Sequence, residues 1–125
     1  MAHASEIIAI LEALVDAFNQ HDLDQIMEFF ADDCSLDMPR GSEPWGTRYV
    51  GKAEVRRGLQ SRFEMLPDVQ YLDARHFATD QMGVSEWLVT GTLKSGKTVK
   101  VRGCDHYEFR DGQVIRKDSY WKIVE

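Results

Sequence analysis

The sequence predicts an α+β domain in which helices pack on one face of a curved antiparallel sheet. Apolar residues recur at helical spacing through most of the first half of the chain, and they alternate with polar residues in most of the second half. The 125 residues fit a single domain, 1–125, that is large enough to bury a core. No repeat, low-complexity segment or linker divides this domain.

Three helices are predicted in the first half. Ser5 is a candidate N-cap for the first helix, whose apolar stripe ends at Phe18. Asp22 and Gln25 have capping-box spacing for a second, shorter helix. The third is expected over residues 52–66, where a proline then follows.

The remaining segments predict strands and one long loop. Residues 34–38 form a short strand-like run, and residues 39–51 are the only long irregular segment. Because this loop carries Trp45, it is a candidate lid over a pocket, and packing of the same ring against the helices as a plug is the alternative. Alternation predicts further strands over 69–78, 83–93 and 99–109, before a closing arm.

The most informative residue is Asp105, in the hairpin that spans 97–125. In the first arm of this hairpin, the residues on one face are mostly apolar: Val99, Val101, Gly103, Tyr107 and Phe109. Asp105 lies in the middle of that face. A carboxylate among core residues must find a partner, shift its pKa or line a wet cavity.

The turn of this hairpin leaves two registers open. With a two-residue Asp-Gly loop, Asp105 lies opposite Asp118, and one of the two carboxyl groups would have a raised pKa. With a three-residue loop, Asp105 lies opposite Lys117 and Val101 lies opposite Trp121. We favour the second register, because it pairs apolar residues with each other and gives the acid a cation.

Composition argues against several classes of partner. The formal net charge of −6 argues against nucleic acid, which needs a basic surface. No apolar run approaches the roughly 20 residues of a membrane helix, and no signal-peptide pattern begins the chain. The two cysteines, Cys34 and Cys104, do not make a disulfide framework. We therefore expect a cytoplasmic protein that contacts neither membrane nor nucleic acid.

Metal and cofactor sites are not expected either. Cys104 and His106 share a strand face, but a metal site needs three or four convergent ligands, and the chain offers no such spacing. No phosphate loop, dinucleotide fingerprint or Ser-His-Asp arrangement is present.

The order of elements resembles the nuclear transport factor 2-like superfamily, and two segments add specificity. Residues 30–44 (FADDCSLDMPRGSEP) are similar to the ketosteroid isomerase segment in which an acidic pair precedes a strand. Residues 104–109 (CDHYEF) are similar to the isomerase strand that carries its oxyanion-hole aspartic acid. The closing Asp-Gly-Gln-Val-Ile arm also fits the SnoaL-like polyketide cyclases. The resemblance implies a cone-shaped curved antiparallel sheet, with three N-terminal helices packed on its concave face, that encloses a cavity.

Only one isomerase residue carries over to this chain, namely Asp105. Met38 occupies the position of the general-base aspartate. Asp37 lies one residue earlier and so points to the opposite face, unless a bulge rotates the strand. Leu14 lies near the position of the oxyanion tyrosine. We therefore expect almost no ketosteroid isomerase activity.

These residues and the resemblance indicate a small cofactor-free enzyme of the SnoaL-like class that acts by proton transfer on a hydrophobic small molecule. The reaction would be an isomerisation, an aldol cyclisation or a hydration. The candidate catalytic residues are Asp105, Lys117, Asp37 and Asp118. The candidate ligand-binding residues are Met38, Trp45, Phe63, Trp87, Tyr107 and Trp121.

Two alternatives to an enzyme stay open. One is a non-catalytic domain that binds a small molecule, and the other is an interaction domain that works through its sheet. Whether or not the chain is an enzyme, the outward face of the last arm mixes charged and aromatic residues, which suits an interface. We therefore expect a homodimer through the face that presents Arg116, Asp118, Tyr120 and Lys122 beside Cys104 and His106.

Overall fold

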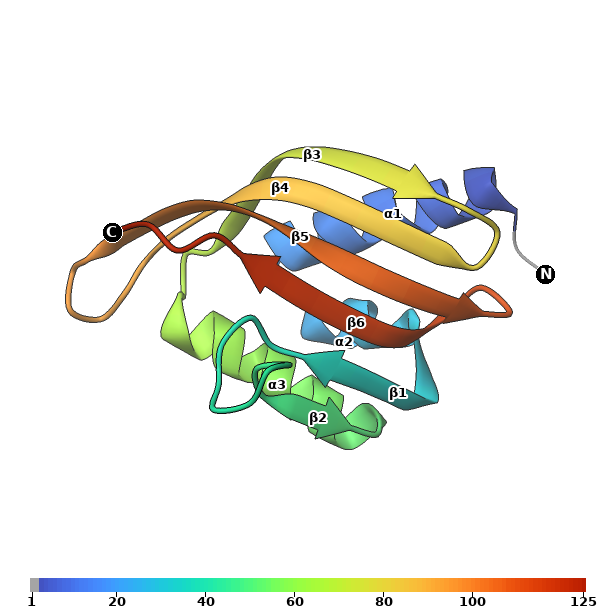
Figure 1. Ribbon diagram of the computed structural model, residues 1–125, viewed down its shortest axis with the longest axis horizontal. Helices are drawn as coiled ribbons and strands as arrows, with labels where there is room; N and C mark the ends of the chain where they lie inside the picture. Colours follow the sequence, from blue (N-terminus) through green and yellow to red (C-terminus); the bar gives the residue numbers. More distant parts are fainter. Residues whose placement is uncertain (1–2) are drawn as a thin grey trace.

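The computed structural model describes residues 3–125, which form three helices and a six-stranded sheet (Figure 1). In chain order the elements are α1 (Ala4–Asn19), α2 (Leu23–Glu28), β1 (Phe30–Asp37), β2 (Arg48–Val50), α3 (Lys52–Met65), β3 (Gln70–Ala78), β4 (Met82–Thr92), β5 (Thr98–Arg110) and β6 (Gln113–Trp121). None of these helices is long and apolar enough to cross a membrane.

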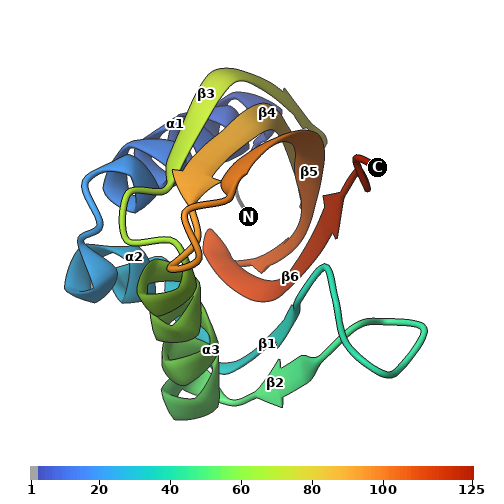
Figure 2. The same ribbon diagram turned by 90° about the vertical axis from the view of Figure 1, so that its left-hand side faces the viewer.

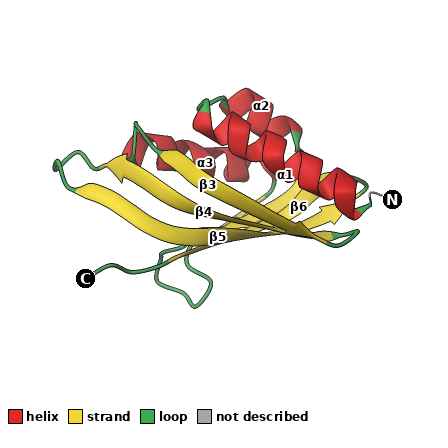
Figure 3. Ribbon diagram, turned by 90° about the horizontal axis from the view of Figure 1, so that it is seen from above, coloured by secondary structure: helices red, strands yellow, loops and turns green. Residues whose placement is uncertain are grey.

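The sheet curls around one side of the molecule and the helices cover its concave face (Figures 2 and 3). The strand order is β2-β1-β6-β5-β4-β3. The predicted fold class is confirmed, but the expectation of a wholly antiparallel sheet is wrong at one place, because β1 and β6 are parallel. β2 pairs with one edge of β1, and after α3 and the β3–β5 meander the last strand, β6, pairs with the other edge.

The helices pack on opposite halves of the sheet. Helix α1 contacts β3 and β4, and α3 contacts β1 and β2. At Gly58 of α3, an added Cβ would lie 2.8 Å from the Tyr49 ring, so a glycine allows this close approach. The prediction that Asp22 caps the second helix is confirmed by a bond from the Gln25 amide, at 3.1 Å. The prediction of Ser5 as the first cap is wrong, since α1 begins one residue before it.

The β5–β6 hairpin follows neither of the two predicted registers. Its turn has two residues, Asp111 and Gly112, with φ of 51° and 78°, as a type I′ turn requires. Ile115 of β6 then forms a bulge, because Glu108 pairs with Arg116 while Phe109 pairs with Val114. The bulge shifts all later pairs by one residue relative to the plain two-residue hairpin.

As a result, the predicted partners of the first arm change. Asp105 lies opposite Ser119, instead of Lys117 or Asp118. Trp121 lies opposite Gly103, so the predicted pair of Val101 with Trp121 is also wrong.

Candidate functional site

Three cross-strand rows build the inner face of the sheet around Asp105. The middle row is polar and runs from Ser85 on β4 through Asp105 to Ser119 on β6. One neighbouring row pairs Tyr107 with Lys117. The other row is Trp87, Gly103 and Trp121. Asp105 therefore lies between aromatic side chains, with a lysine on the adjoining row.

Gly103 makes room for the two tryptophans. A Cβ at this position would lie 2.7 Å from the Trp87 ring and would also clash with the Tyr120 carbonyl. The Trp87 and Trp121 rings meet edge to face, with their centroids 6.2 Å apart. The lack of a side chain at Gly103 thus allows the Trp87 and Trp121 rings to pack together next to Asp105.

The Asp105 carboxylate accepts three hydrogen bonds. Its Oδ1 atom accepts from Lys117 Nζ at 2.9 Å and from Ser119 Oγ at 2.6 Å. Its Oδ2 atom accepts from Trp87 Nε1 at 3.2 Å. Lys117 Nζ also donates to Ser119 Oγ at 2.8 Å. The expectation that Lys117 shares the face of Asp105 is therefore confirmed, although the two residues belong to adjoining rows.

Burial changes the pKa values of two side chains beside Asp105, namely Lys117 and Tyr107. Asp105 and Lys117 are each 5% exposed. Burial lowers the pKa of the Lys117 ammonium, an effect that the Asp105 charge opposes. Burial also raises the pKa of the Tyr107 phenol well above its usual value, and Asp105 adds to this rise. At neutral pH, Tyr107 is therefore an uncharged hydrogen-bond donor.

A second buried cation, Arg62 on α3, was not among the predicted site residues. It is 5% exposed. Its guanidinium donates to the Tyr71 hydroxyl at 3.4 Å and approaches the Met38 sulfur at 3.9 Å. It also lies 4.2 Å from the centre of the Trp121 ring. A signal was available in the sequence, since Val55, Leu59 and Arg62 have the i, i+4, i+7 spacing of a single helix face.

A pocket of about 300 Å³, which we call the slot, opens between β6 and the loop after β1. It exists because β1 ends at Asp37, opposite Asp118, while β6 continues to Trp121. The slot is lined by Met38, Pro39, Pro44, Trp45, Gly46, Arg116, Asp118, Ser119, Tyr120 and Trp121. Ser119 in this wall hydrogen-bonds Asp105, and Met38 and Trp121 contact Arg62.

The other two candidate acids, Asp37 and Asp118, lie on the outer face of the sheet. Asp37 is 1% exposed and accepts two bonds from Arg48, at 2.7 and 3.0 Å. Arg116 bridges Asp37 at 3.5 Å and Asp118 at 3.1 Å. The hydrogen bonds from Arg48 hold the pKa of Asp37 below its usual value, and Arg116 adds to this. The structure therefore does not bring these acids together with Asp105.

The predicted ligand-binding residues lie in four places. Trp87 and Tyr107 are buried beside Asp105. Phe63 packs against Phe18 and His21, with ring centroids 6.3 and 4.7 Å away. Trp45 is 44% exposed on the outer loop, where its ring lies 4.8 Å from the Arg48 guanidinium. The remaining two, Met38 and Trp121, connect the slot to Arg62.

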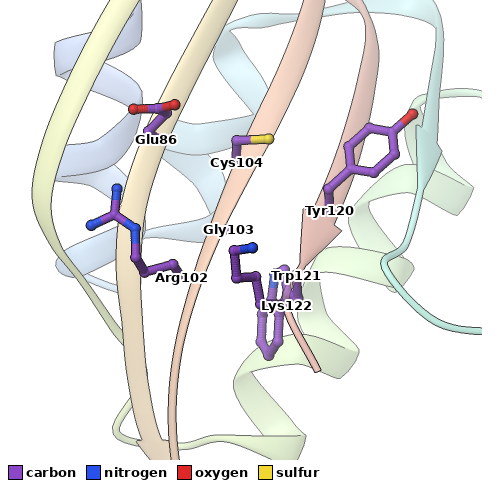
Figure 4. A pocket seen from close by; sticks show the side chains of 7 residues that line it. All are labelled: Glu86, Arg102, Gly103, Cys104, Tyr120, Trp121 and Lys122. Atoms are coloured by element: carbon purple, nitrogen blue, oxygen red, sulfur yellow. The ribbon is translucent and has the colours of Figure 1, made fainter. Parts of the chain in front are cut away.

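A separate pocket of about 240 Å³ lies over β4, β5 and β6, and is lined by Glu86, Arg102, Gly103, Cys104, Tyr120, Trp121 and Lys122 (Figure 4). Burial raises the pKa of its Cys104 thiol, so this thiol is a poor nucleophile. Glu86 in the same wall is paired with Arg75 at 3.1 Å. These groups suit a contact surface better than an acid–base site.

Comparison with known proteins finds a family match and solved structures with the same fold. A family model described as a SnoaL-like domain matches residues 11–117. No curated protein gives a significant match. The fold matches that of a candidate polyketide cyclase from Xanthomonas campestris pv. campestris, with a TM-score of 0.84 and 25% identity over 95% of this chain and 92% of that chain.

Two further solved structures share the fold. One is a nuclear transport factor 2-like protein from Burkholderia xenovorans LB400, with a TM-score of 0.81 and 20% identity. The other is a candidate polyketide cyclase from Pseudomonas putida KT2440, with a TM-score of 0.81 and 17% identity. Each match covers 98% of this chain and 93% of the other chain.

Proposed function

Since this chain belongs to the SnoaL-like domain family, we propose that it is a small cofactor-free enzyme that transfers a proton on a hydrophobic small molecule. The reaction class is isomerisation, intramolecular aldol cyclisation or hydration. One observation carries the proposal: Asp105 and Lys117 form a hydrogen-bonded acid–base pair, at 2.9 Å, inside an aromatic interior. The likeness of the fold to candidate polyketide cyclases supports the same choice.

Each polar group in the interior has a role in this reaction. Asp105 takes a proton from an acidic C–H bond next to a carbonyl group, or returns it. Burial lowers the pKa of Lys117, which makes its ammonium a more ready proton donor than an exposed lysine. The uncharged Tyr107 phenol is a donor for the oxyanion that develops in the transition state. Ser119 links the pair to the slot.

The slot is the proposed route for the substrate. Ser119 and Trp121 reach it from β6, and Met38 reaches it from the end of β1. A methionine side chain adapts readily to a new neighbour, so Met38 is the residue best able to move aside. The ring of the substrate then packs against Trp121, and its reacting carbon faces Asp105. We also propose that the cone encloses a cavity in which the substrate binds.

Turnover of a pair of matched variants tests the proposal. Polycyclic ketones and epoxides are first screened to find a substrate. Asp105→Asn combined with Lys117→Met removes both charges without leaving either one unpaired, and we expect turnover to fall by about 10²–10⁴. Asp37→Asn is the control, because it changes a buried carboxylate on the outer face that does not line the slot, and it should keep turnover within about twofold. Turnover that survives in the double variant would refute proton transfer by this pair.

A non-catalytic binding domain is the second candidate function. The observation that favours it is that both oxygens of Asp105 already accept hydrogen bonds from the protein. Under this alternative, ligands from the same screen bind and are recovered chemically unchanged. Any ligand converted to product by the wild-type chain excludes it.

We also propose that the chain forms a homodimer through the outer face of β4–β6. Tyr120 is 53% exposed there, and its ring lies 5.1 Å from that of His106. Sedimentation at micromolar concentration tests the assembly, and Tyr120→Glu should shift the protein to monomer by placing a charge in the contact. A wild-type chain that sediments as a monomer contradicts the proposal.

A further inference from the structure

Arg62 is a buried cation without a counter-ion. Within residues 3–125, no carboxylate lies within ion-pair distance of its guanidinium. Its neighbours are a phenol, a thioether and an indole ring, all of which are uncharged. Arginine is almost never fully buried unless it is paired, because removing the charge from water is costly. The fold therefore maintains this cation for a reason other than an internal ion pair.

Two buried hydrogen-bond donors here, one on Arg62 itself and one on Trp121, also lack a partner. Arg62 Nε and Trp121 Nε1 are both buried, and neither bonds to any described residue. The guanidinium lies 4.2 Å from the Trp121 ring, so the two side chains are in contact. Most buried donors in folded proteins are satisfied. Because these two unsatisfied donors belong to side chains in contact, an acceptor oxygen bound there would gain hydrogen bonds.

The charges on the inner face point to an anion. Among the described residues, the buried charged side chains on this side are Lys117 and Asp105 on the sheet and Arg62 on α3, which are two cations and one acid. The positive charge of Arg62 contributes to the lowered pKa of Lys117, so the two cations sense each other. One more negative charge would balance this set, whereas a neutral acceptor would leave it positive.

The slot gives a molecule access to these donors. Two of its wall residues, Met38 and Trp121, are the ones that contact Arg62. The contact to Met38 is weak, at 3.9 Å to sulfur, so an incoming oxygen can replace it. The lining of the slot also includes Pro39 and Pro44, which suit the apolar body of a ligand.

We infer that Arg62 and the Trp121 indole N–H bind an anionic oxygen of the substrate, a carboxylate or an ionised enol carried on an apolar ring system. That the ligand is a substrate rests on the proposed function, whereas the anion site itself does not. The competing account is a structural stack of Arg62 on Trp121, helped by the position of Arg62 in the last turn of α3.

Binding of two matched probes tests the charge requirement. The probes are 2-naphthoate and its neutral isostere 2-naphthamide, and the indole N–H signals of the three tryptophans are followed by NMR. We expect 2-naphthoate to bind saturably, to shift the Trp121 signal most, and to bind at least about tenfold more tightly than the amide. Equal affinity for both probes, or no binding of either, would overturn the inference. A third probe, ionised 2-hydroxy-1,4-naphthoquinone, shows whether the site prefers an enolate or a carboxylate.

Arg62→Met tests the residue itself, with Arg57→Met on the exposed side of the same helix as the control. We expect Arg62→Met to weaken 2-naphthoate at least about tenfold, to leave 2-naphthamide unchanged, and to melt at or above the wild-type temperature, since an unpaired buried charge is removed. Unchanged affinity for 2-naphthoate would overturn the inference. If Arg62→Met does not fold, Trp121→Phe decides: it keeps the ring and loses the N–H, so weaker binding supports the site and unchanged binding contradicts it.

Asp105→Asn separates this inference from the proposed function. The variant removes the reacting acid but leaves Arg62 and Trp121 in place, so we expect 2-naphthoate to bind it as well as it binds the wild type, or more tightly. Retained turnover of a substrate in this variant would refute proton transfer by Asp105, while the anion site would still stand on the probe data. Weakened 2-naphthoate binding in this variant, measured at a temperature where both proteins are fully folded, counts against the anion site.

Discussion

Each face of the sheet buries a carboxylate, but the cations paired with the two carboxylates differ in their exposure to water. On the outer face, Asp37 receives a two-pronged contact from Arg48 and a third bond from Arg116. The side chains of these arginines are 43% and 38% exposed, so both cations also reach water. On the inner face, Asp105 is paired with Lys117, which is almost fully buried.

In the outer cluster, Asp37 and Asp118 both have arginine partners. The pair of Arg48 with Asp37 also holds the end of the loop after β1 against the sheet. Arg116 and Tyr120 also satisfy the neighbouring Asp118. The inner cluster contains an additional buried cation and leaves two donors without partners. Buried charges that are incompletely paired lower the stability of a fold. The contrast supports the proposal that the inner group binds a ligand, whereas the outer group is satisfied within the fold.

The largest effect is expected when the inner pair is broken on one side. Asp105→Asn leaves the Lys117 ammonium buried without its counter-ion, so we expect a loss of about 3–5 kcal/mol in the free energy of unfolding, measured with urea. The matched outer change, Asp118→Asn, leaves Arg116 able to reach solvent and should cost no more than about 2 kcal/mol. Equal losses for the two variants would remove the distinction between the two faces.

A smaller effect is expected at Gly103, where the aromatic wall of the inner site depends on the lack of a side chain. In Gly103→Ala the new methyl group meets the Trp87 ring and the Tyr120 carbonyl, and we expect a loss of about 1–3 kcal/mol in urea unfolding. The Trp fluorescence should change as well, because the Trp87 ring must move. Gly96→Ala is not a fair control, since Gly96 has a positive φ. Gly91→Ala on β4 is the better control, because it adds the same methyl group to a strand at a position where the nearest atom, a Leu66 side-chain carbon, is 3.1 Å away.

The outer cluster should show itself in the dependence of stability on acid. The pKa of Asp37 is lowered in the folded state, chiefly by Arg48, so the folded state favours the charged carboxylate. Its contribution is present above the ordinary pKa of about 3.8–3.9 and is lost as the pH falls through the lowered value. At pH 7 we expect Asp37→Asn to be less stable than the wild type by about 1–2 kcal/mol. The gap should close as the pH falls below the lowered pKa, and a gap that stays constant down to strong acid would contradict this assignment.

Most elements of the fold were predictable because they rest on a local signal. The helical spacing before Pro67 and the alternation around Tyr107 placed the helices and five of the strands within a few residues, but β2 (Arg48–Val50) lies in the segment that was expected to be irregular. The parallel pairing of β1 with β6 has no local signal, since it depends on where the last strand returns. The bulge at Ile115 was also not predictable, because the Asp-Gly turn fits both a plain and a bulged hairpin.

The candidate site was predicted only in part. Lys117 joined Asp105 although its predicted register was wrong, because residues on adjoining rows of one face are still within reach of a long side chain. Arg62 was missed because an arginine on a helix is expected on its solvent face. The pairing of Asp37 was missed because its main partner, Arg48, comes after a loop whose path no local pattern defines.

Urea unfolding of the double variant Asp105→Asn with Lys117→Met tests most directly whether the inner charges are maintained for function. The introduced asparagine would keep an acceptor for Trp87, and the introduced methionine would fill the volume of the lysine without its charge. We expect the free energy of unfolding to equal that of the wild type or to exceed it by about 1–4 kcal/mol, because removing a whole buried ion pair is often neutral or stabilising. A loss of several kcal/mol would show that the pair holds the fold together, and would contradict the account.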